Sequence, residues 1–284
     1  MTTWNIEVPP QINHKELYYR IGTEIGRGGY GIVYECRDDW DNDLVAKLVV
    51  PQQGDTTETV YARWMDEIQK LMLLRHPNIT FLHDAFFCEG HFYLIIEKCD
   101  LTLWQILNNP AIPKKPLIFP IARCILQAID FIHKNGYVHK DLHPGNVFAT
   151  FIKDDLHPDN RNAVTFKVGD LGISRLVKDI NVFNTILAPW MLPPEYLSPE
   201  SFGVVGPATD IYHAGLTLLS FVVGQTLAFT NDQILNGYPM KYAENFGEIG
   251  KLLANALNPH VEARYQTALE FWKDIKELRV TKTI

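Results

Sequence analysis

Cysteine is scarce in this chain, and no two cysteines form a C-x-x-C pair. The sequence has 284 residues and four cysteines, which are scattered along it: Cys36, Cys88, Cys99 and Cys124. Such spacing does not indicate a zinc site, and a disulfide framework is not expected in a chain of this length. We therefore expect buried free thiols and a reducing compartment.

The sequence also has little that would suggest export, membrane insertion or binding to polyanions. Its first ten residues have neither a basic opening nor an apolar run, so they do not predict a signal peptide. The longest uncharged stretch, 211–230, includes His213 and predicts a buried core helix followed by a turn. The formal net charge of -7 argues against a nucleic-acid or anionic-lipid surface. We expect a cytoplasmic or otherwise intracellular protein without a nucleic-acid partner or membrane insertion.

The composition and length are those of a globular protein. Hydrophobic residues make up 46% and charged residues 21% of the chain. The length suits one large domain or two lobes around a cleft. Residues 1–15 carry Pro9 and Pro10 and no periodicity, so we interpret them as an N-terminal extension.

The stretch 139–146, which reads His-Lys-Asp-Leu-His-Pro-Gly-Asn, carries the strongest chemical signal. Pro144 and Gly145 keep it from becoming a helix. Asp141 can orient or deprotonate a hydroxyl, and the side-chain carbonyl of Asn146 can hold a metal ion. Taken alone, the same residues are also ordinary turn formers.

A glycine-rich segment lies between two predicted strands, 18–25 and 32–36. Its G-x-G-x-x-G pattern is made by Gly26, Gly28 and Gly31. A dinucleotide site would need a helix after the glycines, and a strand is predicted there instead. A strand–loop–strand arrangement can lay backbone amides over ATP phosphates. The alternative is a glycine-rich hairpin turn without a ligand.

A third predicted strand, 44–50, contains Lys47 within an apolar run. Burying this lysine is costly unless it is paired. The segment 62–74 has helical spacing of apolar residues and carries Glu67 among them. A lysine held by a helix glutamate can position nucleotide phosphates. The alternative for Glu67 is a solvated charge on a helix face.

The remaining patterned segments complete the expected element order. Helices are predicted at 101–107, 118–135 and 268–278, strands at 147–152 and 166–168, and a hairpin insertion at 153–163.

From about residue 18 to residue 278, these motifs resemble in order those of the eukaryotic-type (Hanks-type) protein kinases. Further matching motifs are the hinge 94–99, Asp170-Leu-Gly in place of D-F-G, Pro194-Glu195 at the end of A-P-E, Asp210, and Arg264. The resemblance implies an α+β, bilobal kinase fold. It has an N-terminal antiparallel β-sheet lobe with helix C at 16–97 and a mainly α-helical C-terminal lobe at 98–284, with a single kinase domain at 16–280.

The resemblance also implies a catalytic site that uses ATP and Mg²⁺, with Mn²⁺ as an alternative. Lys47, held by Glu67, would grip the α- and β-phosphates. Asp141 would orient the acceptor hydroxyl, and Asn146 and Asp170 would hold the metal.

The other implied roles concern nucleotide binding and internal support. The nucleotide would lie against Gly26, Gly28, Gly31, Val33, Val45, Lys47, Glu97, Cys99 and Phe148. Asp210 would hold the catalytic-loop backbone, and Glu195 and Arg264 would form a buried bidentate pair. An internal spine would consist of Leu71, Leu82, His139 and Leu171.

Three positions depart from the family's usual pattern. His143 replaces a lysine that touches the transferred phosphate, Lys140 replaces an arginine that grips an activation-loop phosphate, and Ala188 replaces a threonine. We expect transfer to a Ser or Thr hydroxyl of a protein, with autophosphorylation. The alternatives are a nucleotide-binding pseudokinase scaffold and a small-molecule kinase with an Asp-Leu-His-Pro-Gly-Asn loop. Phosphorylation of Thr185, ordering its segment through Lys140, is a regulatory hypothesis.

Overall fold

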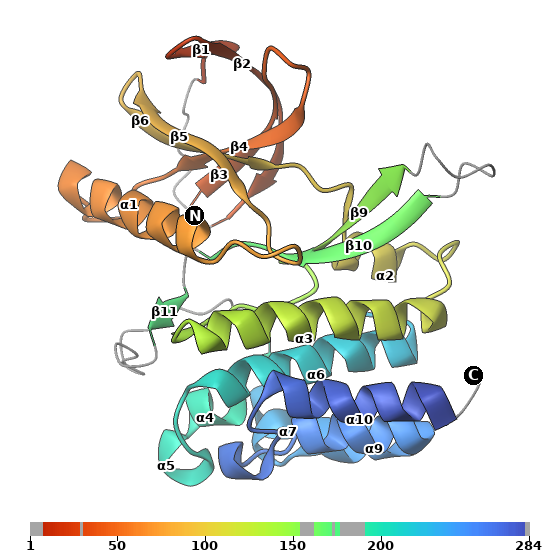
Figure 1. Cartoon of the computed structure of the whole chain (residues 1–284). Helices are drawn as coiled ribbons and strands as arrows, with labels where there is room; N and C mark the ends of the chain where they lie inside the picture. Colours follow the sequence, from red (N-terminus) through yellow and green to blue (C-terminus); the bar gives the residue numbers. More distant parts are fainter. Residues whose placement is uncertain (1–7, 29–30, 154–161, 172–173, 177–190, 282–284) are drawn as a thin grey trace. The chain divides into compact units, whose positions relative to one another are not determined.

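The computed structural model describes residues 8–28, 31–153, 162–171, 174–176 and 191–281. The chain divides into two compact units. Unit 1 consists of Met1–Arg75 and Thr80–Lys98, and unit 2 consists of His76–Ile79 and Cys99–Ile284. Unit 1 is built mainly from strands and unit 2 mainly from helices (Figure 1). The expected α+β kinase fold is confirmed.

Unit 1 contains a six-stranded antiparallel sheet in the order β1-β2-β3-β4-β6-β5. Its strands are β1 Gln11–His14, β2 Leu17–Arg27, β3 Gly31–Arg37, β4 Asp43–Val49, β5 Leu82–Cys88 and β6 His91–Glu97. In β3, Ile32, Tyr34 and Cys36 are buried, whereas Val33 and Glu35 between them are half-buried. This period of two matches the strand predicted at 32–36.

The first strand of unit 1 lies inside the segment interpreted as an extension. β1 pairs with β2 along its whole length, from Gln11 opposite Arg20 to His14 opposite Leu17. Ile12 is 1% exposed and belongs to the core of the sheet. Four residues are too short to show a reliable alternation, so the sequence pattern did not reveal this strand.

The helix of unit 1, α1, spans Thr57–Leu73 and packs against β5 and β6. It begins earlier than the predicted range of 62–74 because the Thr56 hydroxyl accepts a hydrogen bond from the Thr59 N–H and caps the first turn. Val60 and Trp64 bury their side chains against Phe92 and Leu94. Glu67 lies on the same buried side of the helix.

Unit 2 contains two small sheets. The first has the order β10-β9-β7 and the second pairs β11 with β8. Their strands are β7 Leu101–Thr102, β8 Tyr137–Val138, β9 Val147–Lys153, β10 Asn162–Val168 and β11 Arg175–Leu176. The hairpin of β9 and β10 extends farther than predicted on both sides, from 147 to 153 and from 162 to 168. The rest of the predicted insertion lies outside the described residues.

The helix predicted at 101–107 is wrong in its first two residues. Leu101 and Thr102 pair with Ala149 and Phe148 as β7. Helix α2 then begins at Leu103, because Thr102 and Gln105 form a reciprocal capping box. The apolar spacing of 101–107 did not reveal that the helix is capped at Thr102 and begins only at Leu103.

The helices of unit 2 form its core, and α3, α6 and α10 run nearly parallel in Figure 1. The α-helices are α2 Leu103–Asn108, α3 Ile118–Lys134, α4 Pro194–Leu197, α5 Pro199–Phe202, α6 Pro207–Val223, α7 Asn231–Leu235, α8 Tyr238–Ala243, α9 Gly247–Ala256 and α10 Ala268–Thr281. Short 3-10 helices lie at Lys115–Leu117, Glu244–Phe246 and Val261–Ala263. Helix α6 is buried from Ala208 to Phe221 and ends at Gly224, as expected for a core helix followed by a turn.

Among the described residues, one helical stretch has the length and composition of a membrane span. It covers Lys115–Lys134, with a mean hydropathy of 1.3 over its most apolar window. Within the fold, 44% of that window is buried, and α3 packs against α6 and α10. A core helix passes the same test, so this stretch is weak support for a span.

Candidate active site

Unit 1 brings Lys47 and Glu67 together. Lys47 Nζ on β4 donates to Glu67 Oε1 on α1 at 2.7 Å. The two side chains are 11% and 6% exposed. The expected pairing is confirmed, and it explains how a lysine can lie within an apolar strand.

Strand register in unit 1 gathers the predicted nucleotide-facing side chains. Val33 lies opposite Lys47, and Glu35 lies opposite Val45. Because directly opposed residues point to the same side of a sheet, Val33, Val45 and Lys47 share one face. This face is the one that the resemblance assigns to ATP.

Close approach of β3 to β4 explains why position 31 is a glycine. A Cβ on Gly31 would lie 2.9 Å from the backbone oxygen of Leu48 and 3.3 Å from Cε of Lys47. Gly28 N–H also donates to the Gly31 oxygen at 2.9 Å. The middle of the glycine loop, residues 29–30, lies outside the described residues. The predicted roles of Gly26, Gly28 and Gly31 toward phosphate remain predictions.

The segment expected to be the hinge ends strand β6 in unit 1. Glu97 N–H donates to the Phe81 oxygen at 3.2 Å, and its carboxylate accepts from the Phe81 N–H at 3.0 Å. Lys98 Nζ contacts Glu35 Oε1 at 2.8 Å. Cys99 and Phe148 belong to unit 2, where both are half-buried.

Unit 2 brings Asp141 and Asn146 together on the loop after β8. Asn146 Nδ2 donates to the backbone oxygen of Asp141 and to its Oδ2, both at 3.0 Å. These two bonds fix the orientation of the amide, so its Oδ1 is the side-chain atom that can accept a cation. The two roles expected of this loop, orienting a hydroxyl and holding a metal ion, remain predictions.

Asp210 anchors the backbone of the same loop from within helix α6. Its carboxylate accepts from the N–H groups of His139 and Lys140, both at 2.8 Å, and faces His133 Nε2 at 2.8 Å. Burial alone would raise the pKa of Asp210, but these hydrogen bonds and the nearby histidines hold the pKa below its ordinary value. Lys140 is buried and has a left-handed backbone with φ +69°, a conformation that the anchored N–H groups stabilise.

His139 connects the catalytic loop to Asp170. Asp141 N–H donates to His139 Nδ1 at 3.2 Å, so the ring proton lies on Nε2, which donates to the Gly169 oxygen at 3.0 Å. Gly169 N–H in turn donates to the backbone oxygen of Asn146 at 2.9 Å. Gly169 is thus held at both ends of its backbone. This fixes the position of Asp170, whose own φ is +57°.

His143 folds back within its loop. Its Nδ1 accepts from the Gly145 N–H at 3.0 Å, and its Nε2 lies 3.6 Å from Asp141 Oδ1. Burial lowers the pKa of His143, although the charge of Asp141 acts in the opposite direction.

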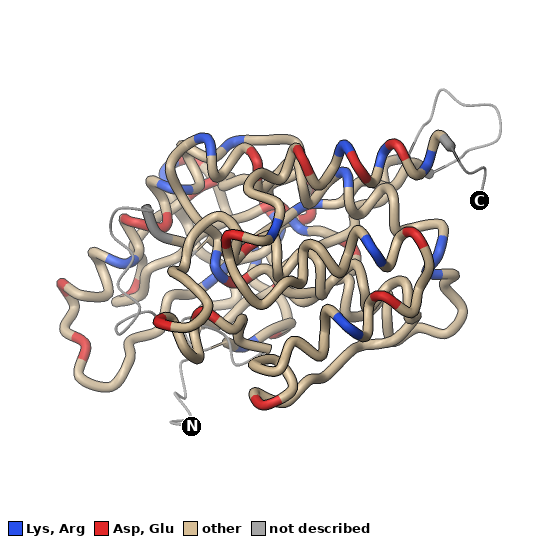
Figure 2. Tube along the Cα trace, turned by 90° about the horizontal axis from the view of Figure 1, so that it is seen from below, with Lys and Arg blue, Asp and Glu red and all other residues tan. Residues whose placement is uncertain are grey.

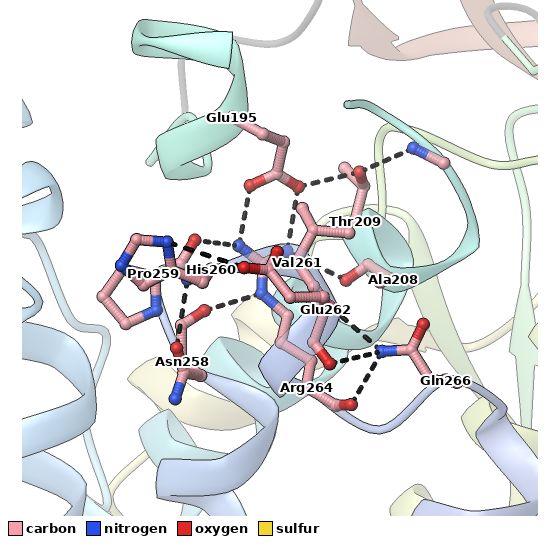
Figure 3. Close-up of polar contacts among 11 residues, drawn as sticks. Glu195, Ala208, Thr209, Asn258, Pro259, His260, Val261, Glu262, Arg264 and Gln266 are labelled. Carbon is pink, nitrogen blue, oxygen red and sulfur yellow. Dashed lines mark hydrogen bonds and ion pairs between the residues drawn. The ribbon is translucent and has the colours of Figure 1, made fainter. Parts of the chain in front are cut away.

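Unit 2 contains a buried ion pair between Glu195 and Arg264, which is shown in Figure 3. Arg264 Nη1 donates to Glu195 Oε1 at 2.8 Å and Nη2 donates to Oε2 at 2.7 Å. The Thr209 hydroxyl also donates to Oε1 at 2.8 Å. The remaining arginine donors reach the backbone oxygens of Asn258, Ala208 and Pro259. The expected buried bidentate pair is confirmed.

The sequence did not predict the contacts of three residues that support the fold around these sites. His133 faces Asp210, Thr209 bonds Glu195, and Asn78 Nδ2 donates to the Phe166 oxygen at 2.8 Å. Each acts across at least 14 residues of sequence. A lone polar residue carries no local signal of such a contact.

The predicted site residues are divided between the units, and some predictions lie outside the described part of the chain. Unit 1 holds Lys47 and Glu67, and unit 2 holds Asp141, Asn146 and Asp170. The predicted spine is similarly divided, with Leu71 and Leu82 in unit 1 and His139 and Leu171 in unit 2. It remains a prediction. Thr185 and Ala188 are among the undescribed residues.

A strand-rich unit with a Lys–Glu pair and a helical unit with an anchored Asp–Asn loop define the protein kinase class. The family profile described as "Protein kinase domain" matches residues 19–281. The chain therefore belongs to the protein kinase family.

Relatives with curated names agree with this family. Cyclin-dependent kinase-like 1 of Caenorhabditis elegans is 29% identical over 209 residues, which is 72% of this chain and 55% of the relative. Probable serine/threonine-protein kinase PknB of Lactococcus lactis is 32% identical over 73% of this chain and 32% of the relative. Serine/threonine-protein kinase PknB of Mycolicibacterium smegmatis is 27% identical over 92% and 43%, respectively. The chain thus spans about half or less of the length of these relatives.

Proposed function

We propose that this chain transfers the γ-phosphoryl group of ATP to a serine or threonine hydroxyl of a protein. The observation that carries the proposal is the Asp141–Asn146 contact, in which one amide binds Asp141 through Nδ2 and keeps its Oδ1 for a cation. Protein kinases use ATP with a divalent metal ion. The printed names of the Lactococcus and Mycolicibacterium relatives favour serine or threonine as the acceptor.

In this proposal, some side chains hold the nucleotide and Asp141 orients the acceptor hydroxyl. Lys47, placed by Glu67, holds the α- and β-phosphates. Asp141 accepts a hydrogen bond from the incoming hydroxyl and orients its oxygen in line with the γ-phosphorus. Val33 and Val45 of unit 1, and Phe148 of unit 2, are the apolar side chains that we assign to adenine binding.

Asn146 and Asp170 suit a hard cation, because both offer side-chain oxygen atoms. The fit is supported by the amide orientation of Asn146 and by the hydrogen bonds that fix Gly169 beside Asp170. We propose Mg²⁺, with Mn²⁺ as the alternative. Held by Asn146 and Asp170, such an ion would supply positive charge to offset that of the phosphates.

The decisive experiment compares the full chain with its Asp170→Asn variant. Radiolabelled γ-phosphate from ATP should appear on dephosphorylated casein or on the chain itself with the parent but not with the variant. Asp232→Asn is a matched control, because Asp232 is exposed on α7, and it should label like the parent. Equal labelling by Asp170→Asn and the parent would contradict an enzymatic role. Nucleotide binding by the parent without any transfer would favour the pseudokinase alternative.

The molecule that receives the phosphate distinguishes a protein kinase from a small-molecule kinase. A parent that consumes ATP only in the presence of a small-molecule extract, and labels no protein, would support that alternative. Labelling of casein or of the chain itself supports protein phosphorylation.

We also propose that the chain phosphorylates itself, with Thr185 as the candidate site. The support is its position ten residues before Glu195, in a sequence segment where added phosphate could attract Lys140. Mass spectrometry after incubation with ATP should detect the phosphate, and Thr185→Ala should lower activity. Unchanged activity in that variant would contradict a regulatory role.

We propose an intracellular setting and a protein partner rather than nucleic acid or membrane. The four cysteines are free thiols, which suits a reducing compartment. Lys and Arg are interspersed with Asp and Glu along the described trace (Figure 2), and the formal net charge is -7. Neither feature favours a polyanionic partner. Cell fractionation followed by phosphosite mapping in a lysate tests the setting and the substrate.

A further inference from the structure

The ring of His143 has a tautomer that its surroundings dictate. Gly145 N–H points at Nδ1 at 3.0 Å, and a nitrogen that accepts a hydrogen bond cannot carry a proton itself. The proton of the neutral ring is therefore on Nε2. This is the nitrogen that faces Asp141 Oδ1 at 3.6 Å.

Asp141 is consequently approached by a donor at each carboxylate oxygen. Asn146 Nδ2 donates to Oδ2 at 3.0 Å, and the Nε2–H of His143 faces Oδ1. The histidine contact is slightly longer than a hydrogen bond, as is common before substrate tightens a catalytic site. Both side chains are mostly buried, with 18% and 15% exposure, so the attraction is weakly screened.

Two neighbours keep the imidazole in place. The edge of the ring packs against Trp104, at a centroid distance of 6.1 Å and an interplanar angle of 79°. A Cβ at Gly145 would lie 2.7 Å from Cε1 and 2.9 Å from Nδ1 of the ring. A side chain at position 145 and this ring position exclude each other.

We propose that His143 is a positioning residue that fixes the carboxylate of Asp141 through Nε2–H, and that Gly145 is required because it admits and orients the imidazole. The inference rests on the proposed function, in which Asp141 orients the acceptor hydroxyl. In this inference, the neutral ring of His143 contacts the carboxylate of Asp141. The usual lysine at this position, by contrast, contacts phosphate as a cation.

The kinetic experiment uses His143→Leu, which lacks the donor, and His143→Gln, whose amide can place an N–H near the former Nε2. We expect kcat to fall about tenfold in His143→Leu, within the roughly hundredfold that a 1 Å misplacement can cost. In His143→Gln, kcat should recover to within a few-fold of the parent. KM for ATP should stay within twofold in both, because the phosphates are not the group contacted. His260→Leu, at an exposed histidine 4.0 Å from Glu262, is the matched control and should leave kcat unchanged.

Nitrogen NMR of the histidine rings gives a readout that does not depend on activity. The ring signals that disappear in His143→Gln belong to His143. At neutral pH they should show a protonated Nε2 and an unprotonated Nδ1. A protonated Nδ1, or a doubly protonated ring, would overturn the assignment.

A double-mutant cycle tests the role of Gly145. Gly145→Ala should lower kcat in the parent because the new methyl displaces the ring. In a His143→Ala background, the nearest remaining atom is Trp104 Cε3 at 3.5 Å, an ordinary contact, so the same change should cost less than twofold. Equal losses in both backgrounds would contradict the coupling.

The outcomes separate this inference from the proposed function. An inactive parent contradicts the proposed function, while the NMR measurement still decides the tautomer. If the parent is active, the role of His143 is contradicted when His143→Leu retains full kcat. It is also contradicted when this variant changes KM for ATP instead of kcat.

Discussion

Unit 1 and unit 2 each contain a buried pair of opposite charges, but the two pairs are enclosed differently. Lys47 and Glu67 remain 11% and 6% exposed, whereas both side chains of the Glu195–Arg264 pair are 0% exposed. Arg264 donates to both carboxylate oxygens and to three backbone oxygens. The enclosed pair suits a permanent part of the fold, and the more open pair suits binding of a further charged group.

Of the substitutions considered below, loss of the Arg264 guanidinium should reduce the stability of the fold most. Arg264→Leu leaves Glu195 buried without its cation, which should lower the free energy of unfolding by roughly 3–5 kcal/mol. That loss corresponds to a Tm lower by roughly 10 °C in thermal unfolding. Arg264→Lys keeps the charge but not the forked geometry and should lose less. If the Tm of Arg264→Leu lay within 1 °C of that of the parent, the Glu195–Arg264 pair would not be the more important of the two pairs for stability.

Lys47 should matter more for transfer than for folding. Lys47→Met removes the group that holds the phosphates, so kcat/KM should fall about a hundredfold to a thousandfold. Its Tm should fall less than that of Arg264→Leu. Lys251→Met is a suitable control, because Lys251 is an exposed lysine that also pairs with a glutamate, at 3.1 Å. Full activity with a large drop in Tm would reverse the roles assigned to the two pairs.

Acid should weaken unit 2 through His213, which lies on the same helix as Asp210. Burial lowers the pKa of His213 from 6.5 to about 4, although the charges of Asp210, Glu195 and Asp141 partly oppose this and His143 adds to it. The unfolded chain therefore binds a proton between pH 6.5 and 4 that the folded chain does not. Stability is complete above pH 6.5 and should fall by about 3 kcal/mol as the pH drops to 4.

Denaturant unfolding at several pH values measures that slope. In His213→Gln, which has no titrating ring, this part of the slope should disappear. An identical slope in the parent and the variant would show that His213 does not titrate as its burial implies. The depressed pKa of Asp210 adds a loss in the same direction, as the pH falls through that lower pKa.

Thr209 should give the smallest of these effects. Thr209→Val keeps the shape but removes the hydroxyl that donates to Glu195 and accepts from the Gly206 N–H. We expect a loss of about 1–2 kcal/mol in denaturant unfolding. Thr59→Val, at an exposed position of α1, is the comparison and should change stability less. If Thr209→Val lost as much stability as Arg264→Leu, the Thr209 hydroxyl would contribute as much as the guanidinium to the stability of the contacts around Glu195.

Elements with a sustained pattern could be predicted from the sequence. The segment 32–36 is rich in β-branched and aromatic residues, and the apolar residues of 118–135 have helical spacing. Both segments adopt the predicted structure. The Lys47–Glu67 and Glu195–Arg264 pairs were expected because each residue belongs to a recognisable ordered motif.

Features without a local pattern could not be predicted. β1 is four residues long, and its identity depends on pairing with β2. The contact of His133 with Asp210 joins positions 77 residues apart. The exclusion between His143 and a side chain at 145 is a matter of a few tenths of an ångström, which only atomic positions reveal.

The contact between His143 and Gly145 also has a consequence for how this loop can change over generations. While the imidazole occupies its place, most single substitutions at position 145 meet the ring. A descendant that first acquires the lysine common in the family at position 143 releases position 145 to vary. A descendant that starts at position 145 must pass through a less fit intermediate. The two codons are therefore expected to diverge in a preferred order, with position 143 leading.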